Sequence, residues 1–382
     1  MSLTGSVFLG LVMAVTAVAF VTLVVMWPRL AGRHPARIAA RAGMLLGLNA
    51  LVLLTAATQL NAQFLFFADW TDLHGALGGA STVTAVSRGA SASGAAGRKV
   101  TGAAATAATA LPALPTTGVS SSGVISYTVA GPLSGITGKI MVQLPPGYSD
   151  PANGSTRYPV LETFQGYPSS PAQWIGTMNL GGAMAQVVAN HRMRTALIVS
   201  PQLEFPAGVD TECVNGPSGS PQVQTWLAQD VPDWVTRTFR VATDRASWAT
   251  IGLSAGGWCA AMLTMLHPAQ YAAAIVMGGY FRPEFGAGYD PYPPGSALAS
   301  SYDLVALAKR APPSVAIWVE TSHSDPVSYG STAALLKSAH PPTAVTATVL
   351  QHAGHRISLW QGLLPGSLAW LGTNVPGFSP AH

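Results

Sequence analysis

The sequence contains few charged residues. Asp, Glu, Lys and Arg make up 9% of its 382 residues, against roughly 25% in an average soluble protein. Disordered chains, acidic tails and coiled coils all need many charges, so these classes are excluded. Cysteine is also scarce, because two residues are too few for a disulfide scaffold and their spacing is not that of a zinc site. We also expect no metal and no organic cofactor.

The basic residues are unevenly distributed along the chain. Residues 1–122 hold seven Lys/Arg and two Asp/Glu, a net charge of +5, whereas residues 123–382 hold twelve and thirteen, a net charge of −1. A nucleic-acid-binding domain needs a basic patch on its folded part. The larger part of the chain lacks such an excess, so we expect no nucleic-acid partner.

Two long uncharged runs lie near the N-terminus, at Leu3–Trp27 and Met44–Ala68. At about 1.5 Å per residue, each is long enough to cross a hydrocarbon core of roughly 30 Å. A cleaved signal peptide is the alternative for the first run, but Met1–Gly5 lacks the basic residues of such a peptide. The sequence predicts a membrane anchor over residues 1–75, with transmembrane helices at about 3–27 and 44–68.

The flanking charges predict the orientation of this hairpin in the lipid bilayer. The loop between the runs carries Arg29, Arg33, Arg37 and Arg41. Two aspartates follow the second run, and the next basic residue is Arg88. Short Arg-rich loops stay in the cytoplasm. We therefore expect a two-span protein of the cell membrane with a cytoplasmic loop and an extracellular C-terminal part.

The rest of the chain changes character at about residue 123. Residues 76–122 are dominated by Ala, Gly, Ser and Thr and contain no aromatic residue, which is typical of a flexible linker. Over residues 123–382, apolar runs of strand length alternate with stretches of helical spacing. This alternation predicts an α/β fold with a mostly parallel sheet and helices on both faces.

One motif in this domain indicates a catalytic residue. Residues Gly252–Gly256 read G-x-S-x-G, between an apolar strand at Trp248–Leu253 and an apolar helix from Ala255. In such a strand-turn-helix setting the serine lies on a sharp turn and acts as a nucleophile. We therefore predict that Ser254 is the nucleophile. The alternative is a glycine-rich turn with an incidental serine.

A serine nucleophile needs a base and an acid, which follow it in the order acid, then histidine. His355 comes after the last predicted strand and is the favoured base, with His352 as the alternative. Asp325 lies in the loop after the penultimate strand, Ser314–Val319, and is the favoured acid, although Asp-Pro also begins helices well. Glu320, at the strand end, is the alternative acid.

An oxyanion hole needs two backbone N–H groups. One belongs to the residue after the nucleophile, which is Ala255, and the other comes from the loop after the third strand. That loop is Gln165–Tyr167, and we predict the N–H group of Tyr167 as the second donor.

The two cysteines, Cys213 and Cys259, are predicted to form a disulfide. Their number is even, and disulfides persist outside the cell. Cys259 lies on the helix that follows Ser254, and Cys213 lies in a loop expected at the same edge of the sheet. The alternative is that Cys259 is simply a small buried residue.

The domain resembles the putative esterase family, which contains esterase D, feruloyl esterases and the mycolyltransferases of actinobacteria. The matching pieces are Leu144–Tyr148, Tyr158–Leu161, Gly252–Gly257, and Gly354–His355 followed by Trp360. The resemblance implies an α/β-hydrolase fold and a triad that maps onto Ser254, Asp325 and His355. One departure is Gln165–Gly166, where members often have His-Gly or Asp-Gly.

Together these patterns predict a membrane-anchored, extracellular serine esterase that acts through an acyl-enzyme on an ester, lipid or glycolipid substrate. Two alternatives remain open. The enzyme could be an acyltransferase that passes the acyl chain to a sugar or lipid hydroxyl in the cell envelope. The domain could also be a non-catalytic scaffold with a hydrolase fold.

Overall fold

The computed structural model describes residues 2–78, 83–87, 123–286, 288–293 and 295–380. The chain divides into two units. The first consists of Met1–Thr82 together with two short loops, His323–Asp325 and Gln351–Arg356. The second consists of Val83–Ser322, Pro326–Leu350 and Ile357–His382.

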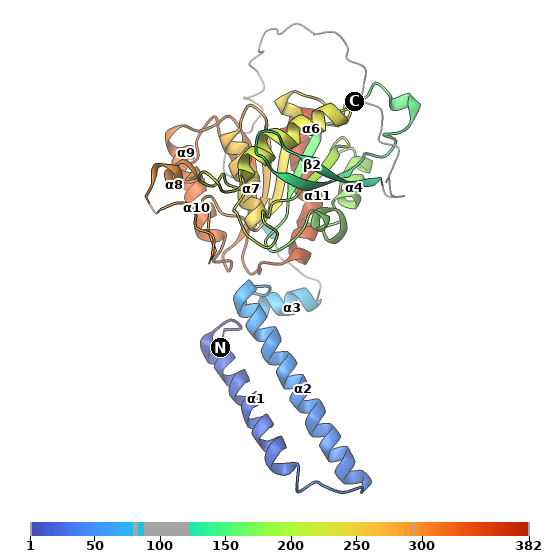
Figure 1. Ribbon diagram of the computed structural model, residues 1–382, viewed down its shortest axis with the longest axis vertical. Coiled ribbons are helices and arrows are strands. Elements are labelled where there is room, and N and C mark those ends of the chain that lie inside the picture. The colour runs from blue at the N-terminus through green and yellow to red at the C-terminus, as the bar shows by residue number, and fades with distance from the viewer. Residues whose placement is uncertain (1, 79–82, 88–122, 287, 294, 381–382) are drawn as a thin grey trace. The chain divides into compact units, whose positions relative to one another are not determined.

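The first unit contains three helices, α1 (Ser6–Met26), α2 (Pro35–Phe64) and α3 (Trp70–Gly78) (Figure 1). Both α1 and α2 are long and apolar enough to cross a membrane. The predicted first run matches α1, but α2 begins at Pro35 rather than at residue 44. Proline at the first turn and the cap that His34 provides start this helix early. It ends before Leu65, which adopts a left-handed φ of 53°.

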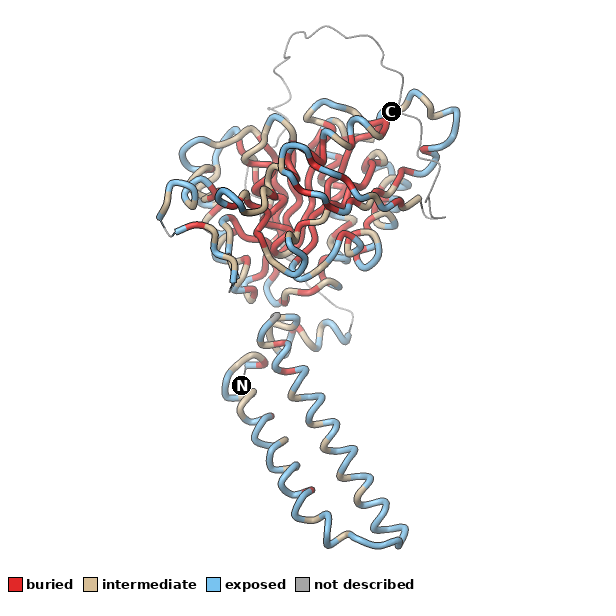
Figure 2. Tube along the Cα trace, in the orientation of Figure 1, coloured by how far each residue is buried: buried red, intermediate tan, exposed pale blue. Residues whose placement is uncertain are grey.

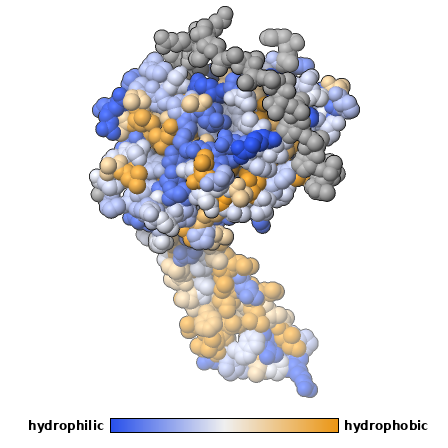
Figure 3. All heavy atoms as spheres, turned by 45° about the horizontal axis from the view of Figure 1, so that its top comes forward, coloured by the Kyte–Doolittle hydropathy of each residue, from blue (hydrophilic) through white to orange (hydrophobic). Residues whose placement is uncertain are grey.

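Apolar side chains remain exposed along α1 and α2. Leu46 and Leu53 are each 70% exposed, and Figure 3 shows apolar residues along most of the hairpin, with hydrophilic residues at its loop end. The two helices also share a polar contact, since the hydroxyl oxygens of Thr16 and Thr55 are 2.8 Å apart. An exposed apolar surface of this extent is typical of a segment that contacts a membrane or another protein.

The second unit is built on a nine-stranded sheet, as far as the described residues show, in the order β1-β9-β8-β7-β6-β4-β5-β3-β2. Strands β4 to β9 run parallel, and β1, β2 and β3 join the edges antiparallel. The strands are β1 (Val83–Ser87), β2 (Val124–Ala130), β3 (Thr137–Gln143), β4 (Val160–Phe164), β5 (Leu197–Pro201), β6 (Trp248–Leu253), β7 (Ala273–Met277), β8 (Ala316–Ser322) and β9 (Ala344–Leu350).

Helices cover both faces of this sheet, as the sequence predicts. Side chains of β7 alternate between two buried clusters, because Ala274 and Val276 belong to one and Ile275 and Met277 to the other. Figure 2 shows the buried strands at the centre of this unit. The helices are α4 (Leu180–Ala189), α5 (Val223–Thr225), α6 (Val231–Thr238), α7 (Ala255–Leu266), α8 (Ala297–Ser301), α9 (Leu304–Arg310), α10 (Tyr329–Ser338) and α11 (Ile357–Asn374).

The predicted flexible linker at 76–122 requires a correction. Helix α3 continues to Gly78, and Val83–Ser87 forms β1, which pairs antiparallel with β9. Val83, Thr84 and Val86 are β-branched residues that favour a strand, and the edge of the sheet offers them a partner. Residues 88–122 of the predicted linker lie outside the described residues.

Candidate active site

Ser254 lies on a sharp turn between β6 and α7. Its backbone has a φ of 56° and a ψ of −126°, which is rare for a residue with a side chain. The turn needs glycine on both sides, since a Cβ at Gly252 would collide with the Gly256 carbonyl, and one at Gly256 with the carbonyls of Phe164 and Gln165. Strained backbone of this kind concentrates at functional sites, and this is the conformation of a nucleophile elbow.

The two predicted oxyanion donors line the same small hollow. Tyr167 and Ala255 both border it, together with Gln165 and Gly166. The N–H group of Gly166 donates to the Gln173 side chain at 3.0 Å. Ala255 begins α7, and a helix N-terminus favours negative charge. The structure therefore brings Tyr167 and Ala255 to one place beside the elbow.

The side chain of Tyr167 is occupied elsewhere. Its hydroxyl donates to the carbonyl of Gly208 at 2.9 Å, and the residue is 44% exposed. Any contribution of Tyr167 to an oxyanion hole therefore comes from its backbone.

Gln165 is the residue at which the sequence differs from the family that it resembles. Its side chain lines the hollow and is only 2% exposed. Neither amide atom has a hydrogen-bond partner among the described residues. A buried polar group without a partner is costly, so this amide is a candidate for hydrogen bonding to a bound substrate.

One side of the hollow is acidic. Glu204 and Asp210 line it, and burial, followed by the nearby Glu204 charge, raises the pKa of Asp210. The neighbouring Glu212 is buried and bonded to the hydroxyl of Tyr280 at 2.5 Å. Burial and the Asp210 charge raise the pKa of Glu212 well above its usual value. Carboxyl groups perturbed in this way beside a strained turn are typical of a functional site.

Cys213 and Cys259, the pair singled out by the sequence, are joined in a disulfide with their Cα atoms 5.7 Å apart. Both cysteines line the hollow. The disulfide therefore joins the loop that contains Asp210 and Glu212 to α7, the helix that begins beside Ser254.

The favoured base and acid meet within the first unit. Nδ1 of His355 lies 3.1 Å from Oδ2 of Asp325, and their side chains are 13% and 5% exposed. A carboxylate at this nitrogen favours the imidazole tautomer whose proton is on Nδ1, as a general base of this kind requires. The alternative base, His352, is mostly exposed and pairs with Asp69 at 2.8 Å.

Glu320, the alternative acid, forms a hydrogen bond within the second unit. Its Oε2 accepts a hydrogen bond from Nε1 of Trp360 at 3.0 Å. The residue is 2% exposed and belongs to β8.

The sequence pattern does not single out Asp72 and Arg356, which form a buried ion pair at 2.7 Å beside His355 in the first unit. One signal was present in the sequence, because Asp72 is one of two acidic residues in the first 122. A rare acid soon after an apolar run invites a search for a basic partner.

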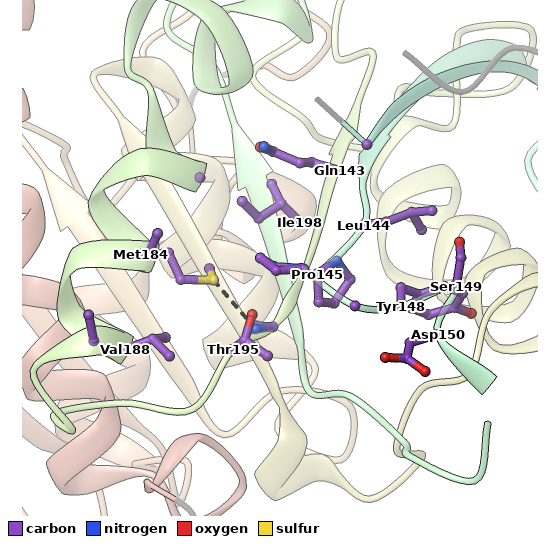
Figure 4. A pocket seen from close by; sticks show the side chains of 17 residues that line it. Gln143, Leu144, Pro145, Tyr148, Ser149, Asp150, Met184, Val188, Thr195 and Ile198 are labelled. Atoms are coloured by element: carbon purple, nitrogen blue, oxygen red, sulfur yellow. Dashed lines mark hydrogen bonds between the residues drawn. The ribbon is translucent and has the colours of Figure 1, made fainter. Parts of the chain in front are cut away.

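A larger hollow of about 740 Å³ lies elsewhere in the second unit. Figure 4 shows its mainly apolar lining, which includes Met184, Val188 and Leu144. It borders the start of β5. Leu197 and Trp248, the first residues of β5 and β6, both pair with Val160 of β4, so these two strands start at the same end of the sheet. Ser254 follows the last residue of β6, so the hollow and the elbow lie at opposite ends of the parallel strands.

The sheet order, the helices on both faces and the elbow after β6 define an α/β-hydrolase fold. The chain belongs to the Putative esterase family, whose profile matches residues 135–371. This match confirms the resemblance that the sequence motifs indicate.

Among curated proteins, the chain is similar to an uncharacterized protein of Corynebacterium glutamicum, with 32% identity over 143 residues. That match covers 37% of this chain and only 33% of the relative. The chain therefore matches about a third of the length of this curated relative.

Three solved structures share the fold. A ferulic acid esterase has a TM-score of 0.55 and 19% identity, and the match covers 67% of this chain and 98% of that one. An S-formylglutathione hydrolase from Agrobacterium tumefaciens has a TM-score of 0.54 and 12% identity, covering 67% and 97%. A fluorophosphonate-binding serine hydrolase from Staphylococcus aureus has a TM-score of 0.51 and 14% identity, covering 65% and 97%.

Proposed function

We propose that this protein is a membrane-anchored serine esterase whose triad is Ser254, Asp325 and His355. The observation that carries the proposal is the strained backbone of Ser254 on its turn between β6 and α7, in a chain of the Putative esterase family. The pair formed by His355 and Asp325 supports it. Along the chain, Asp325 follows β8 and His355 follows β9, in the order that α/β-hydrolases use.

In the proposed reaction, Oγ of Ser254 attacks the ester carbonyl while Nε2 of His355 accepts the hydroxyl proton. The N–H groups of Ala255 and Tyr167 stabilise the oxyanion. His355 then donates its proton to the departing alcohol, which leaves an acyl group on Ser254. A water molecule, deprotonated by His355, releases the acid and restores the serine.

We further propose that α1 and α2 anchor the enzyme in the cell membrane and that the esterase domain lies outside the cell. The exposed apolar lengths of both helices support the anchor. The arginines between the helices favour a cytoplasmic loop. The disulfide between Cys213 and Cys259 fits an oxidising compartment.

Labelling with a fluorophosphonate probe tests the nucleophile. We expect the purified full-length protein in detergent to bind the probe covalently and to hydrolyse p-nitrophenyl butyrate. Ser254→Ala should abolish labelling and lower kcat by about 10⁶. Ser300→Ala, which removes an exposed hydroxyl on α8, is the matched control and should keep both activities.

The same preparation separates the alternatives. An absence of labelling in a folded wild-type protein would favour a non-catalytic scaffold. Product analysis with added sugar and lipid alcohols would distinguish hydrolysis from acyl transfer, because a transferase forms a new ester with the acceptor.

A further inference from the structure

Three consecutive residues around the proposed base are bound by the segment that follows α2. We call residues 61–72 the corner segment; it lies with the loop Gln351–Arg356 in the first unit. The N–H group of His355 donates to the carbonyl of Leu65 at 2.6 Å. The N–H group of Gly354 donates to Oδ2 of Asp72 at 2.8 Å. Arg356 donates to the same oxygen at 2.7 Å.

Asp72 is the centre of these contacts. Its Oδ2 accepts hydrogen bonds from Ala68, Gly354 and Arg356, although the residue is only 4% exposed. Arg356 is 8% exposed, donates also to the carbonyl of Phe66 at 3.2 Å, and lies over the ring of Phe67. Removal of one member of a buried ion pair leaves an uncompensated charge, which is strongly unfavourable. The loop and the corner segment are therefore held firmly together.

The corner segment is itself built for this contact. Leu65 adopts a left-handed φ of 53°, which is unfavourable for a leucine. Asn61 stabilises the turn, because its side chain donates to the carbonyl of Phe67 and accepts from its N–H group. This geometry directs the carbonyl of Leu65 to the N–H group of His355.

Gly354 permits the close approach of the two backbones. A Cβ at this position would collide with the carbonyl oxygens of Leu65 and Phe66. The backbone of the corner segment therefore leaves no room for a side chain at the residue before the proposed base.

A second ion pair between the same segments provides a contrast. His352 and Asp69 are 2.8 Å apart, but their side chains are 56% and 33% exposed. Exposed pairs contribute little, so this contact does not hold the loop.

We propose that Asp72 is a positioning residue for His355, so that the end of the proposed membrane anchor is part of the catalytic apparatus rather than only a tether. This inference rests on the proposed function, because it concerns the base of that reaction. Asp72 acts through Gly354 and Arg356, the two neighbours of His355, and does not itself touch the reacting atoms. The backbone of the base is thereby set by a segment that lies 283 residues before it in the chain.

Two measurements on the full-length protein in detergent test the proposal. The first is hydrogen exchange, for which we expect the amides of Gly354 and His355 to exchange slowly in the wild type. Asp72→Asn should accelerate exchange across residues 351–356 by about tenfold or more. The second is hydrolysis of p-nitrophenyl butyrate, for which Asp72→Asn should lower kcat by about 10- to 100-fold, as a misplaced catalytic group does, with KM within about twofold.

Two further variants complete the design. Ser300→Ala, which changes an exposed hydroxyl on α8 outside the corner segment and the loop, is the control and should leave exchange across residues 351–356 and kcat unchanged. Gly354→Ala pushes the loop from the carbonyls of Leu65 and Phe66 without removing a charge, and should reproduce the fall in kcat if Asp72→Asn does not fold. Circular dichroism establishes which variants are folded.

The results separate this inference from the proposed function. Unprotected amides at Gly354 and His355 in the wild type, or unchanged exchange in folded Asp72→Asn, would overturn the contact itself. Faster exchange with an unchanged kcat would overturn the positioning role. A wild-type protein that neither labels nor hydrolyses would overturn the proposed function, and the positioning role with it, even if the exchange result holds.

Discussion

Nδ1 of His355 lies 3.1 Å from Oδ2 of Asp325, and the two residues come from separate loops of the first unit. Asp325 lies three residues beyond the end of β8, whereas Glu320 is a residue of β8 itself. A loop carboxylate can turn toward the imidazole, and the side chain of Glu320 is bonded to Nε1 of Trp360. The different surroundings of Asp325 and Glu320 allow a direct test of which carboxylate is the acid of the proposed triad.

We expect Asp325→Asn to lower kcat for ester hydrolysis by about 10⁴, because an amide at this position stabilises the wrong imidazole tautomer. Glu320→Gln is the matched control and should cost much less, since its amide oxygen still accepts a hydrogen bond from Trp360. Steady-state kinetics with p-nitrophenyl butyrate and thermal melts of both variants provide the measurement. An inactive Glu320→Gln beside a near-normal Asp325→Asn would assign the acid to Glu320.

The disulfide between Cys213 and Cys259 should stabilise the fold. It closes a loop with a sequence separation of 46, for which chain entropy gives a stabilisation of about 4 kcal/mol. We expect the Cys213→Ala, Cys259→Ala double variant to melt about 10 °C lower than the wild type, as measured by calorimetry. Alkylation of both thiols in unreduced, denatured wild-type protein would contradict the bond.

Glu162 should make stability depend on pH. Burial within β4 raises its pKa to about 8, although the hydroxyl of Tyr271 donates to it at 2.7 Å. Between its ordinary pKa of 4.5 and about 8, the folded state keeps a proton that the unfolded state releases. The free energy of unfolding therefore falls as pH rises through this window and levels off above it.

Thermal melts from pH 5 to pH 9 measure this effect. We expect Glu162→Gln to reduce the fall in Tm across the window, because glutamine has no proton to release. Burial also raises the pKa values of Asp210 and Glu212, so part of the slope should persist in the variant. An identical slope in both proteins would mean that Glu162 is charged in the folded state.

The topology can be tested with reporters. We expect alkaline phosphatase fused after His382 to be active, because the four arginines between α1 and α2 keep their loop in the cytoplasm. The same reporter inserted at Gly32, within that loop, should be inactive. An active cytosolic reporter at His382 together with inactive phosphatase would reverse the topology.

Local patterns in the sequence were enough to predict several parts of this protein. The elbow at Gly252–Gly256 has a local sequence motif between a strand and a helix, and the length and apolarity of α1 follow from composition alone. The alternation of strands and helices predicted a sheet covered on both faces, and that arrangement buries every residue of strands such as β6.

Other features depend on contacts between distant segments, which no local pattern specifies. The contact between Asp325 and His355 follows from the paths of two loops. Strand β1 exists because β9 offers a free edge to residues that resemble a linker. Asp72 and Arg356 are ordinary charged residues in the sequence. Only the tertiary structure brings them together, where burial of their ion pair beside His355 gives each of them a role.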